Sequence, residues 1–154
     1  MALAFWGCDT TVDFNSKTPE EAVINYYKAF EEKNVQAFVA NTSKAKFVNM
    51  GTTDAYAEAI IEYSLSEMES TYGKNVKFEI KNTEVDYLST LDLAYIQKEY
   101  TETAELSGFE VKDAANVTFD ITIKGDAAEK SGGGAACVVF ENGSWKIYAL
   151  ELHI

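Results

Sequence analysis

The last twenty residues of the chain constrain its fold more than any other segment, because they have the pattern of a β-hairpin. Asn142-Gly143 separates two apolar runs rich in β-forming residues, and this dipeptide favours the two-residue turn that needs positive φ at both central positions. A two-residue loop fixes the register of the flanking strands. The expected pairs are Glu141 with Ser144, Phe140 with Trp145, Val139 with Lys146, Val138 with Ile147, Cys137 with Tyr148, Ala136 with Ala149 and Ala135 with Leu150.

Both faces of this hairpin are apolar. Because side chains alternate across a strand, we expect Phe140 and Trp145 on one face and Cys137, Tyr148 and Leu150 on the other. A strand that is apolar on both faces is usually covered on both. The pattern therefore predicts helices against one face and a pocket or a second subunit against the other.

Composition and charge exclude several classes of function. The chain has 154 residues, enough for one domain with a substantial core, and no apolar run of membrane-spanning length. Its net charge of −12 argues against nucleic acids and anionic membrane surfaces, since both require cationic patches. All thirteen basic residues are lysines, which disfavours a dedicated phosphate site because arginine supplies the bidentate fork.

The N-terminal segment resembles the end of a bacterial lipoprotein signal, in which a cysteine after a small residue is lipidated. Gly7-Cys8 follows an apolar stretch and precedes a polar one, although Trp6 stands where a small residue is usual. We expect a signal remnant and linker over 1–16 and a single domain over 17–154. The alternative is a natural or cloned N-terminus with a chance Gly-Cys pair. A lipidated Cys8 would place the domain outside the cytoplasm on a bacterial membrane, with the lipid anchor as its one membrane contact; otherwise it would be secreted.

Capping signals predict four helices: three before the first strand and one between the first two strands. Thr18-Pro19-Glu20-Glu21 combines a cap, a proline at the first helical position and a capping-box glutamate. Asn34 and Ser89 or Thr90 are further caps, and Gly73 is a helix stop. The predicted helices cover Pro19 to about Lys33, a short stretch after Asn34, Thr52 or Thr53 to Gly73, and about 91–106.

Alternating residues predict strands in the second half of the chain. Residues 76–80 alternate, and the phase slips at Asn82-Thr83, which indicates a bulge. Residues 116–124 alternate most regularly, and 125–134 reads as a loop rich in glycine. Helices precede strands and no βαβ repeat occurs, so the fold class is α+β: N-terminal helices packed on a curved, mainly antiparallel sheet.

Several of these segments resemble nuclear transport factor 2-like (cystatin-like) domains. The similar opening is Thr18-Pro19-Glu20-Glu21-Ala22-Val23 with Tyr26-Tyr27-Lys28-Ala29-Phe30 and Asn34-Val35-Gln36-Ala37-Phe38, and the similar ending is the hairpin from Val138 to Ile147. The helix from Asp92 to Leu106 and the strand with Ile121-Thr122-Ile123-Lys124-Gly125 resemble a branch found as uncharacterised lipoproteins of Gram-positive bacteria. The similarity spans roughly 17–152.

This resemblance implies a curved sheet wrapped around a helix to form a cone. Such cones often hold a pocket and often dimerise through the outer face of the sheet. The superfamily includes isomerases, dehydratases, polyketide cyclases and non-enzymatic binding modules, so the fold alone does not name a function.

Aromatic residues are the candidates for a ligand pocket inside the cone. An apolar pocket with a few hydroxyls suits a small amphipathic ligand. The alternative is plain core packing, because aromatic side chains bury large areas. The candidate pocket residues are Tyr26, Tyr27, Phe30, Tyr56, Tyr63, Phe140, Trp145 and Tyr148.

A catalytic set is harder to assemble from this sequence. His153 and Glu151 share a strand face, but they lie at the chain end, where exposure is expected. Tyr26 or Tyr27 with Asp86 or Asp120 could serve ketosteroid isomerase-like chemistry, although no motif supports it; the catalytic assignment is therefore none. No Ser/His/Asp arrangement, metal-ligand spacing or nucleotide motif is present, so no cofactor and no metal are expected.

We therefore expect a non-catalytic envelope lipoprotein domain that binds a small hydrophobic or amphipathic ligand or a protein partner. The alternative is a cone-pocket isomerase or dehydratase that uses a buried Asp or Tyr. A third alternative is a structural role as a homodimer through the apolar sheet face. Of the two cysteines, Cys137 is expected to be a small buried hydrophobe, and a disulfide with Cys8 is left open.

Overall fold

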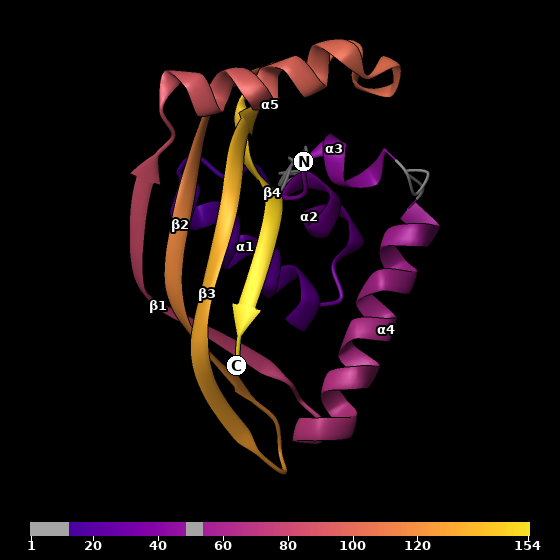
Figure 1. The fold of residues 1–154 in the computed structure, drawn as a ribbon. Coiled ribbons are helices and arrows are strands. Elements are labelled where there is room, and N and C mark those ends of the chain that lie inside the picture. Colours follow the sequence, from indigo (N-terminus) through magenta and orange to yellow (C-terminus); the bar gives the residue numbers. More distant parts are fainter. Residues whose placement is uncertain (1–12, 49–53) are drawn as a thin grey trace, which may run out of the picture.

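The computed structural model describes residues 13–48 and 54–154 (Figure 1). Residues 1–12 and 49–53 lie outside the described part. Residues 1–12 of the predicted signal remnant, with Cys8, and the predicted helix start at Thr52 or Thr53 fall on these residues and stay predictions. Ser16, at the start of the described chain, is buried and its carbonyl accepts the Trp145 backbone N–H at 3.0 Å.

Helices pack against one four-stranded antiparallel sheet, which confirms the α+β prediction. The strand order is β1-β2-β3-β4. Figure 1 shows α1, α2 and α4 on one side of the sheet and α5 lying across its end. No helix in the described ranges is long and apolar enough to cross a membrane. The elements are α1 (Pro19–Glu31), α2 (Val35–Ala40), α3 (Lys44–Phe47), α4 (Asp54–Tyr72), β1 (Lys77–Tyr87), α5 (Thr90–Glu102), η1 (Ala104–Leu106), β2 (Val111–Lys124), β3 (Glu129–Glu141) and β4 (Ser144–His153).

The predicted helix caps form as expected. The Thr18 hydroxyl accepts the Glu21 N–H at 3.2 Å, and the Glu21 carboxylate accepts the Lys17 N–H at 2.8 Å. Asn34 and Ser89 cap α2 and α5 in the same way. Each cap satisfies a backbone N–H that has no partner within its helix.

The predicted slip in the first strand is also present. The register of β1 against β2 shifts between Lys81 and Glu84. Asn82 has φ 50, the left-handed conformation that asparagine tolerates better than most residues. The bulge therefore keeps the apolar residues that precede it and those that follow it on the same face of β1.

The glycine-rich segment is not the loop that its composition predicted, because β3 begins at Glu129 and includes Gly132 to Gly134. Gly134 lies opposite Phe119 on β2. A Cβ at Gly134 would lie 2.4 Å from the Phe119 ring. The glycine is therefore required by the close approach of an aromatic ring in a strand rather than by a turn.

The predicted hairpin register is confirmed near the turn and is wrong farther from it. The pairs from Glu141–Ser144 to Val138–Ile147 form as expected, and the register then shifts between Cys137 and Val138. A bulge adds Tyr148 as an unpaired residue, so the faces of β4 change beyond it. Leu150 consequently packs against the main core and not on the face of Cys137, where it was expected. The observed pairs that replace the predicted ones are Cys137 with Ala149, Ala136 with Leu150 and Ala135 with Glu151.

Two apolar clusters fill the two faces of the sheet. The main core lies between the sheet and the helices α1, α2 and α4, and it contains Phe38, Ile61 and Ile147. The α5 cluster lies on the opposite face and consists of Ile96, Tyr100, Leu106, Val111, Ala114 and Val139.

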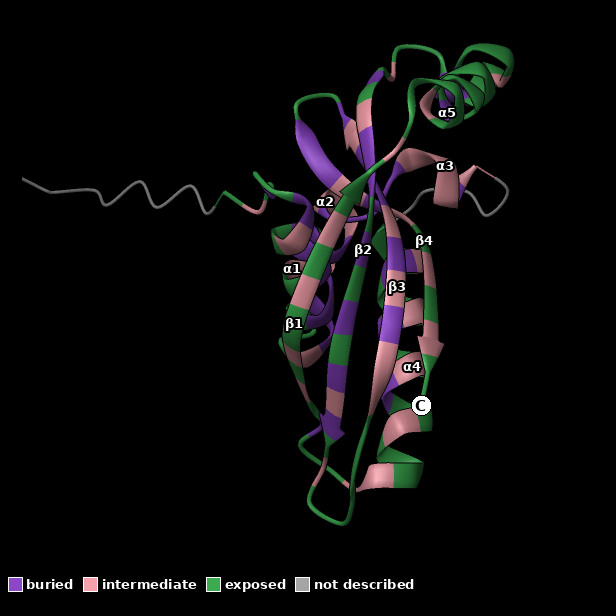
Figure 2. Ribbon diagram, turned by 60° about the vertical axis from the view of Figure 1, so that its left-hand side comes forward, coloured by how far each residue is buried: buried purple, intermediate pink, exposed green. Residues whose placement is uncertain are grey.

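The second face of the closing hairpin therefore meets α5 at this end of the sheet, where a pocket or a second subunit was expected. Farther along the outer face, Ala135 is half-buried and Ala149 and Glu151 are exposed (Figure 2). This part of the face carries small side chains and a charged one, and no large apolar patch. A homodimer through it stays a prediction.

Candidate functional site

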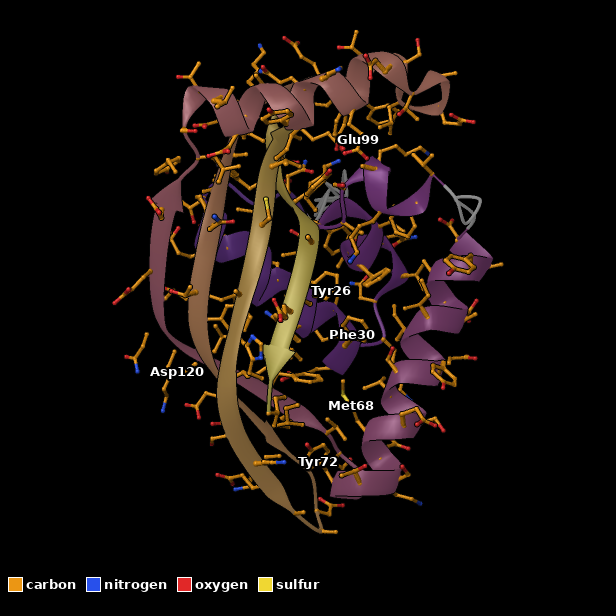
Figure 3. The ribbon with its side chains drawn as sticks, in the orientation of Figure 1. Tyr26, Phe30, Met68, Tyr72, Glu99 and Asp120 are labelled. Atoms are coloured by element: carbon orange, nitrogen blue, oxygen red, sulfur yellow. The ribbon has the colours of Figure 1, made fainter. Side chains whose placement is uncertain are left out.

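The predicted pocket residues divide between the core and the surface. Tyr26, Tyr27, Phe30 and Trp145 are buried in the main core. Figure 3 shows Tyr26, Phe30 and Met68 between the sheet and α4. The aromatic pocket stays a prediction, since the hollows described below have other linings. Of the remaining candidates, Tyr56 and Phe140 pack partly exposed against the main core, Tyr148 packs against the α5 cluster on the other face, and Tyr63 is 69% exposed.

Aromatic rings contact one another throughout the interior of the cone. The Tyr26 ring lies 5.2 Å from both Phe30 and Phe38, and the Tyr27 ring lies 5.2 Å from Phe78. Burial raises the pKa of Tyr26 to about 12 and also raises that of Tyr27. The buried Tyr27 hydroxyl has no hydrogen-bond partner among the described residues. These phenols therefore stay neutral at ordinary pH, and the Tyr27 hydroxyl makes no hydrogen bond within the described part of the chain.

The acid–base candidates from the sequence do not come together at one place: Asp120 lines a hollow on the sheet surface that contains none of the other candidates. Asp86 and Asp120 are exposed, and Asp120 accepts a hydrogen bond from the Asn82 amide at 2.7 Å. His153 lies 3.4 Å from Glu151, but both side chains are in solvent. None of the aspartates in the described ranges is buried. The buried acid in this part of the chain is instead Glu141.

Glu141 borders a hollow of about 290 Å³ at the end of the sheet. The hollow lies between α3, the segment after η1 and the β3–β4 hairpin. Its lining, called here the Glu141 hollow, consists of Val39, Thr42, Lys44, Phe47, Phe109, Glu141 and Lys146.

Backbone pairing at the free edge of β4 brings α3 to this hollow. The Ser43 N–H donates to the Ile147 carbonyl and the Ile147 N–H donates to the Asn41 carbonyl, each at 2.8 Å. This short ladder anchors residues 41–43 beside β4. The first helical residue of α3, Lys44, therefore lies next to the side chain of Glu141.

The Glu141 carboxylate is fully buried and accepts three donors. Its Oε1 accepts the Tyr100 hydroxyl at 2.6 Å and the Lys44 backbone N–H at 2.9 Å. Its Oε2 lies 3.3 Å from the Lys146 ammonium. A buried charge is tolerated only when it is paired and hydrogen-bonded, and this one is. Glu141 thus ties α5, α3 and β4 together.

Tyr100 is held in its neutral form at this site. Burial raises its pKa, and the hydrogen bond to the Glu141 carboxylate raises it further. The nearby Ser43 hydroxyl acts in the opposite direction, although it makes no hydrogen bond of good geometry among the described residues. Tyr100 is therefore a donor to Glu141 and a poor source of protons for other groups.

Two ammonium groups complete the lining. Lys146 is 17% exposed and is the ion-pair partner of Glu141. The Lys44 ammonium lies 5.8 Å from the centre of the Phe109 ring, within the range of a cation–π contact. Chemically, the hollow offers apolar walls, donors on a cation and a carboxylate whose acceptor positions are used within the protein.

No sequence pattern singled out Glu141 or its partners. Glu141 precedes the Asn142-Gly143 turn, where a polar residue is ordinary. Its burial results from residues far away in the chain, Tyr100 on α5 and Lys44 on α3.

Metal and thiol chemistry have little support in the described part of the chain. Residues 13–48 and 54–154 hold no group of three or more metal-ligating side chains that could share an ion. Cys137 is a free, half-buried thiol, and burial raises its pKa. A thiol of raised pKa is less reactive.

Comparison with solved structures identifies the fold. No family model matches the chain, and no curated protein matches it. A protein of unknown function with a cystatin-like fold from Nostoc punctiforme superposes with a TM-score of 0.53 at 11% identity, covering 86% of this chain and 85% of its own. A "putative dehydratase" of the NTF2-like family from Streptomyces avermitilis has a TM-score of 0.43 at 12% identity, covering 86% and 95%. The chain therefore has the predicted cystatin-like fold.

Proposed function

We propose that this chain is a non-catalytic domain that binds a small amphipathic ligand in the Glu141 hollow. The observation that carries the proposal is a hollow of about 290 Å³ with apolar walls and charged groups at one place. Ligand sites combine mostly apolar lining with a few polar groups that orient the ligand. The aromatic side chains first considered as a pocket lie instead in the main core, where their rings contact one another.

The experiment that tests this proposal is an NMR titration with hexan-1-ol and, separately, with hexanoate. Saturable shifts are expected at Phe47 and Phe109. Phe109→Ala should weaken binding because it removes one wall, whereas Phe14→Ala should not. Phe14 is the matched control because it is also half-buried but lines a different hollow. Failure of both probes to bind saturably contradicts the proposal.

An acid–base enzyme is the second candidate, favoured by the 2.6 Å contact between Tyr100 and the buried Glu141. A general base needs a free lone pair directed at the substrate. The oxygens of Glu141 already accept Tyr100, Lys44 and Lys146, which is why binding without catalysis is preferred. Turnover of a hydroxyacyl or enone substrate that Glu141→Gln abolishes would establish the enzyme instead.

We also propose that the domain is anchored at a bacterial envelope through a lipid on Cys8. The support is the Gly7-Cys8 pair with its polar continuation in the sequence. Labelling of cells with a palmitate analogue tests the anchor. Cys8→Ser should abolish incorporation and Cys137→Ser should preserve it. Label retained by Cys8→Ser, or absent from the wild type, contradicts lipidation of Cys8.

A further inference from the structure

We propose that the ligand of the Glu141 hollow is a small amphipathic anion, a monocarboxylate with a short apolar body. This inference rests on the proposed binding function and names the chemistry of its ligand. The charges, the donors and the walls of the hollow each support it.

The charge of the lining is opposite in sign to that of the chain. Lys44 and Lys146 contribute two positive charges, and Glu141 contributes one negative charge. The chain as a whole carries −12. A net positive lining on an acidic protein favours an anion at this place and disfavours anions elsewhere on the surface.

Hydrogen-bond donors remain at the hollow, whereas the acceptor positions of its carboxylate are already used. An ammonium has three donors, and Lys146 lies against one carboxylate oxygen, Glu141 Oε2. Glu141 Oε1 accepts Tyr100 and the Lys44 N–H. A ligand carboxylate would gain charge-assisted hydrogen bonds at Lys146, while a ligand ammonium would find its natural partner already bonded.

The walls and the volume limit the rest of the ligand. Phe47, Phe109 and Val39 supply apolar contact surface. A volume of about 290 Å³ corresponds to roughly ten water molecules, since each occupies about 30 Å³ in the liquid. A chain or ring of about six carbons fits this space. A dianionic phosphate is a poorer match, because the sequence has no arginine to bind it bidentately.

Calorimetric titration with three probes of equal length tests the charge preference. The probes are hexanoate, hexan-1-ol and hexylammonium at pH 7 and low ionic strength. Hexanoate should bind about tenfold more tightly than hexan-1-ol, because it adds a charge-assisted hydrogen bond. Hexylammonium should bind most weakly of the three.

Lysine variants assign the preference to the hollow. Lys146→Met should weaken hexanoate about tenfold and leave hexan-1-ol unchanged, and Lys44→Met should act in the same direction if Lys146→Met fails to fold. Lys46→Met is the matched control, because it removes the same charge from α3 outside the lining.

The outcomes separate the two proposals. Equal binding of hexanoate and hexan-1-ol, unaffected by Lys146→Met, overturns the anion preference and leaves the binding function intact. An equal effect of Lys46→Met and Lys146→Met overturns it as well, since the charge effect would not be local. Failure of all three probes overturns the binding function itself.

Discussion

The two faces of the sheet are packed in opposite ways. The main core contains aromatic rings in contact with one another, and its buried tyrosines keep neutral hydroxyls, one of which has no partner within residues 13–48 and 54–154. The α5 cluster on the other face is smaller, and beside it lies a buried carboxylate with three donors and an adjoining hollow. Burying a charge costs free energy that a core of the first kind avoids. On the function that we propose, the first face stabilises the fold and the second provides the ligand site.

The largest expected effect on stability comes from replacing a phenylalanine by alanine, and it should differ between the two faces. Phe38→Ala should lower the free energy of unfolding by about 3–5 kcal/mol, because the ring is fully buried among Tyr26, Phe30 and Phe47. Phe109→Ala should cost less than about 2 kcal/mol, since its half-buried ring already faces a hollow. Urea denaturation measures both, and equal losses would contradict the comparison.

Alkaline pH should lower the stability of the protein because a buried tyrosine of the main core resists ionisation. Burial raises the pKa of Tyr26 to about 12 from its ordinary value near 10, so the unfolded chain loses this proton first. Stability should therefore be unaffected by this group below pH 10 and fall between pH 10 and pH 12, by at most about 3 kcal/mol.

Tyr26→Phe removes this titration and should make the loss of stability with rising pH shallower. Urea denaturation at pH 9, 10 and 11 measures the slope for both proteins. A variant with the wild-type slope would show that the hydroxyl is not held neutral by burial.

Removing the charge of Glu141 tests the second face. Glu141→Gln should lower the free energy of unfolding by about 2 kcal/mol, because the buried ammonium of Lys146 loses its counter-charge. Glu102→Gln is the control, since its pair with Lys98 is exposed, and should change stability by less than about 0.5 kcal/mol. A similar result for the two variants would mean that the buried ion pair does not stabilise the fold.

The smallest expected effect comes from deleting one hydroxyl on each face. Tyr100→Phe should cost about 1–2 kcal/mol, because Glu141 loses a short hydrogen bond. Tyr27→Phe should be neutral or slightly stabilising, because its hydroxyl has no partner among the described residues. Thermal unfolding measures both variants. A larger loss of stability for Tyr27→Phe than for Tyr100→Phe would contradict the difference between the two faces.

Local chemistry made most of the fold predictable from the sequence. The caps at Thr18 and Asn34 and the turn at Asn142-Gly143 act within a few residues, so their patterns can be read directly. The glycines at 132–134 misled because the groups that they approach lie in other parts of the sheet: the Phe119 ring for Gly134 and the His153 carbonyl for Gly132. The bulge at Tyr148 likewise depends on packing across the sheet and reversed the expected face of Leu150.

The candidate site was less predictable for the same reason. The aromatic residues could be found by composition, but whether they line a pocket or fill a core depends on how closely α1 and α4 approach the sheet. Glu141, Tyr100 and Lys44 are separated by long stretches of chain and share no motif. Their convergence is a property of the tertiary structure alone.

A crystal structure with 6-bromohexanoate tests the central claim most directly, because the anomalous signal of bromine locates the ligand. The expected result is a bromine peak among Val39, Phe47 and Phe109, with the carboxylate at Lys146. A peak inside the cone, among Tyr26, Phe30 and Met68, would contradict the account and support the aromatic pocket instead.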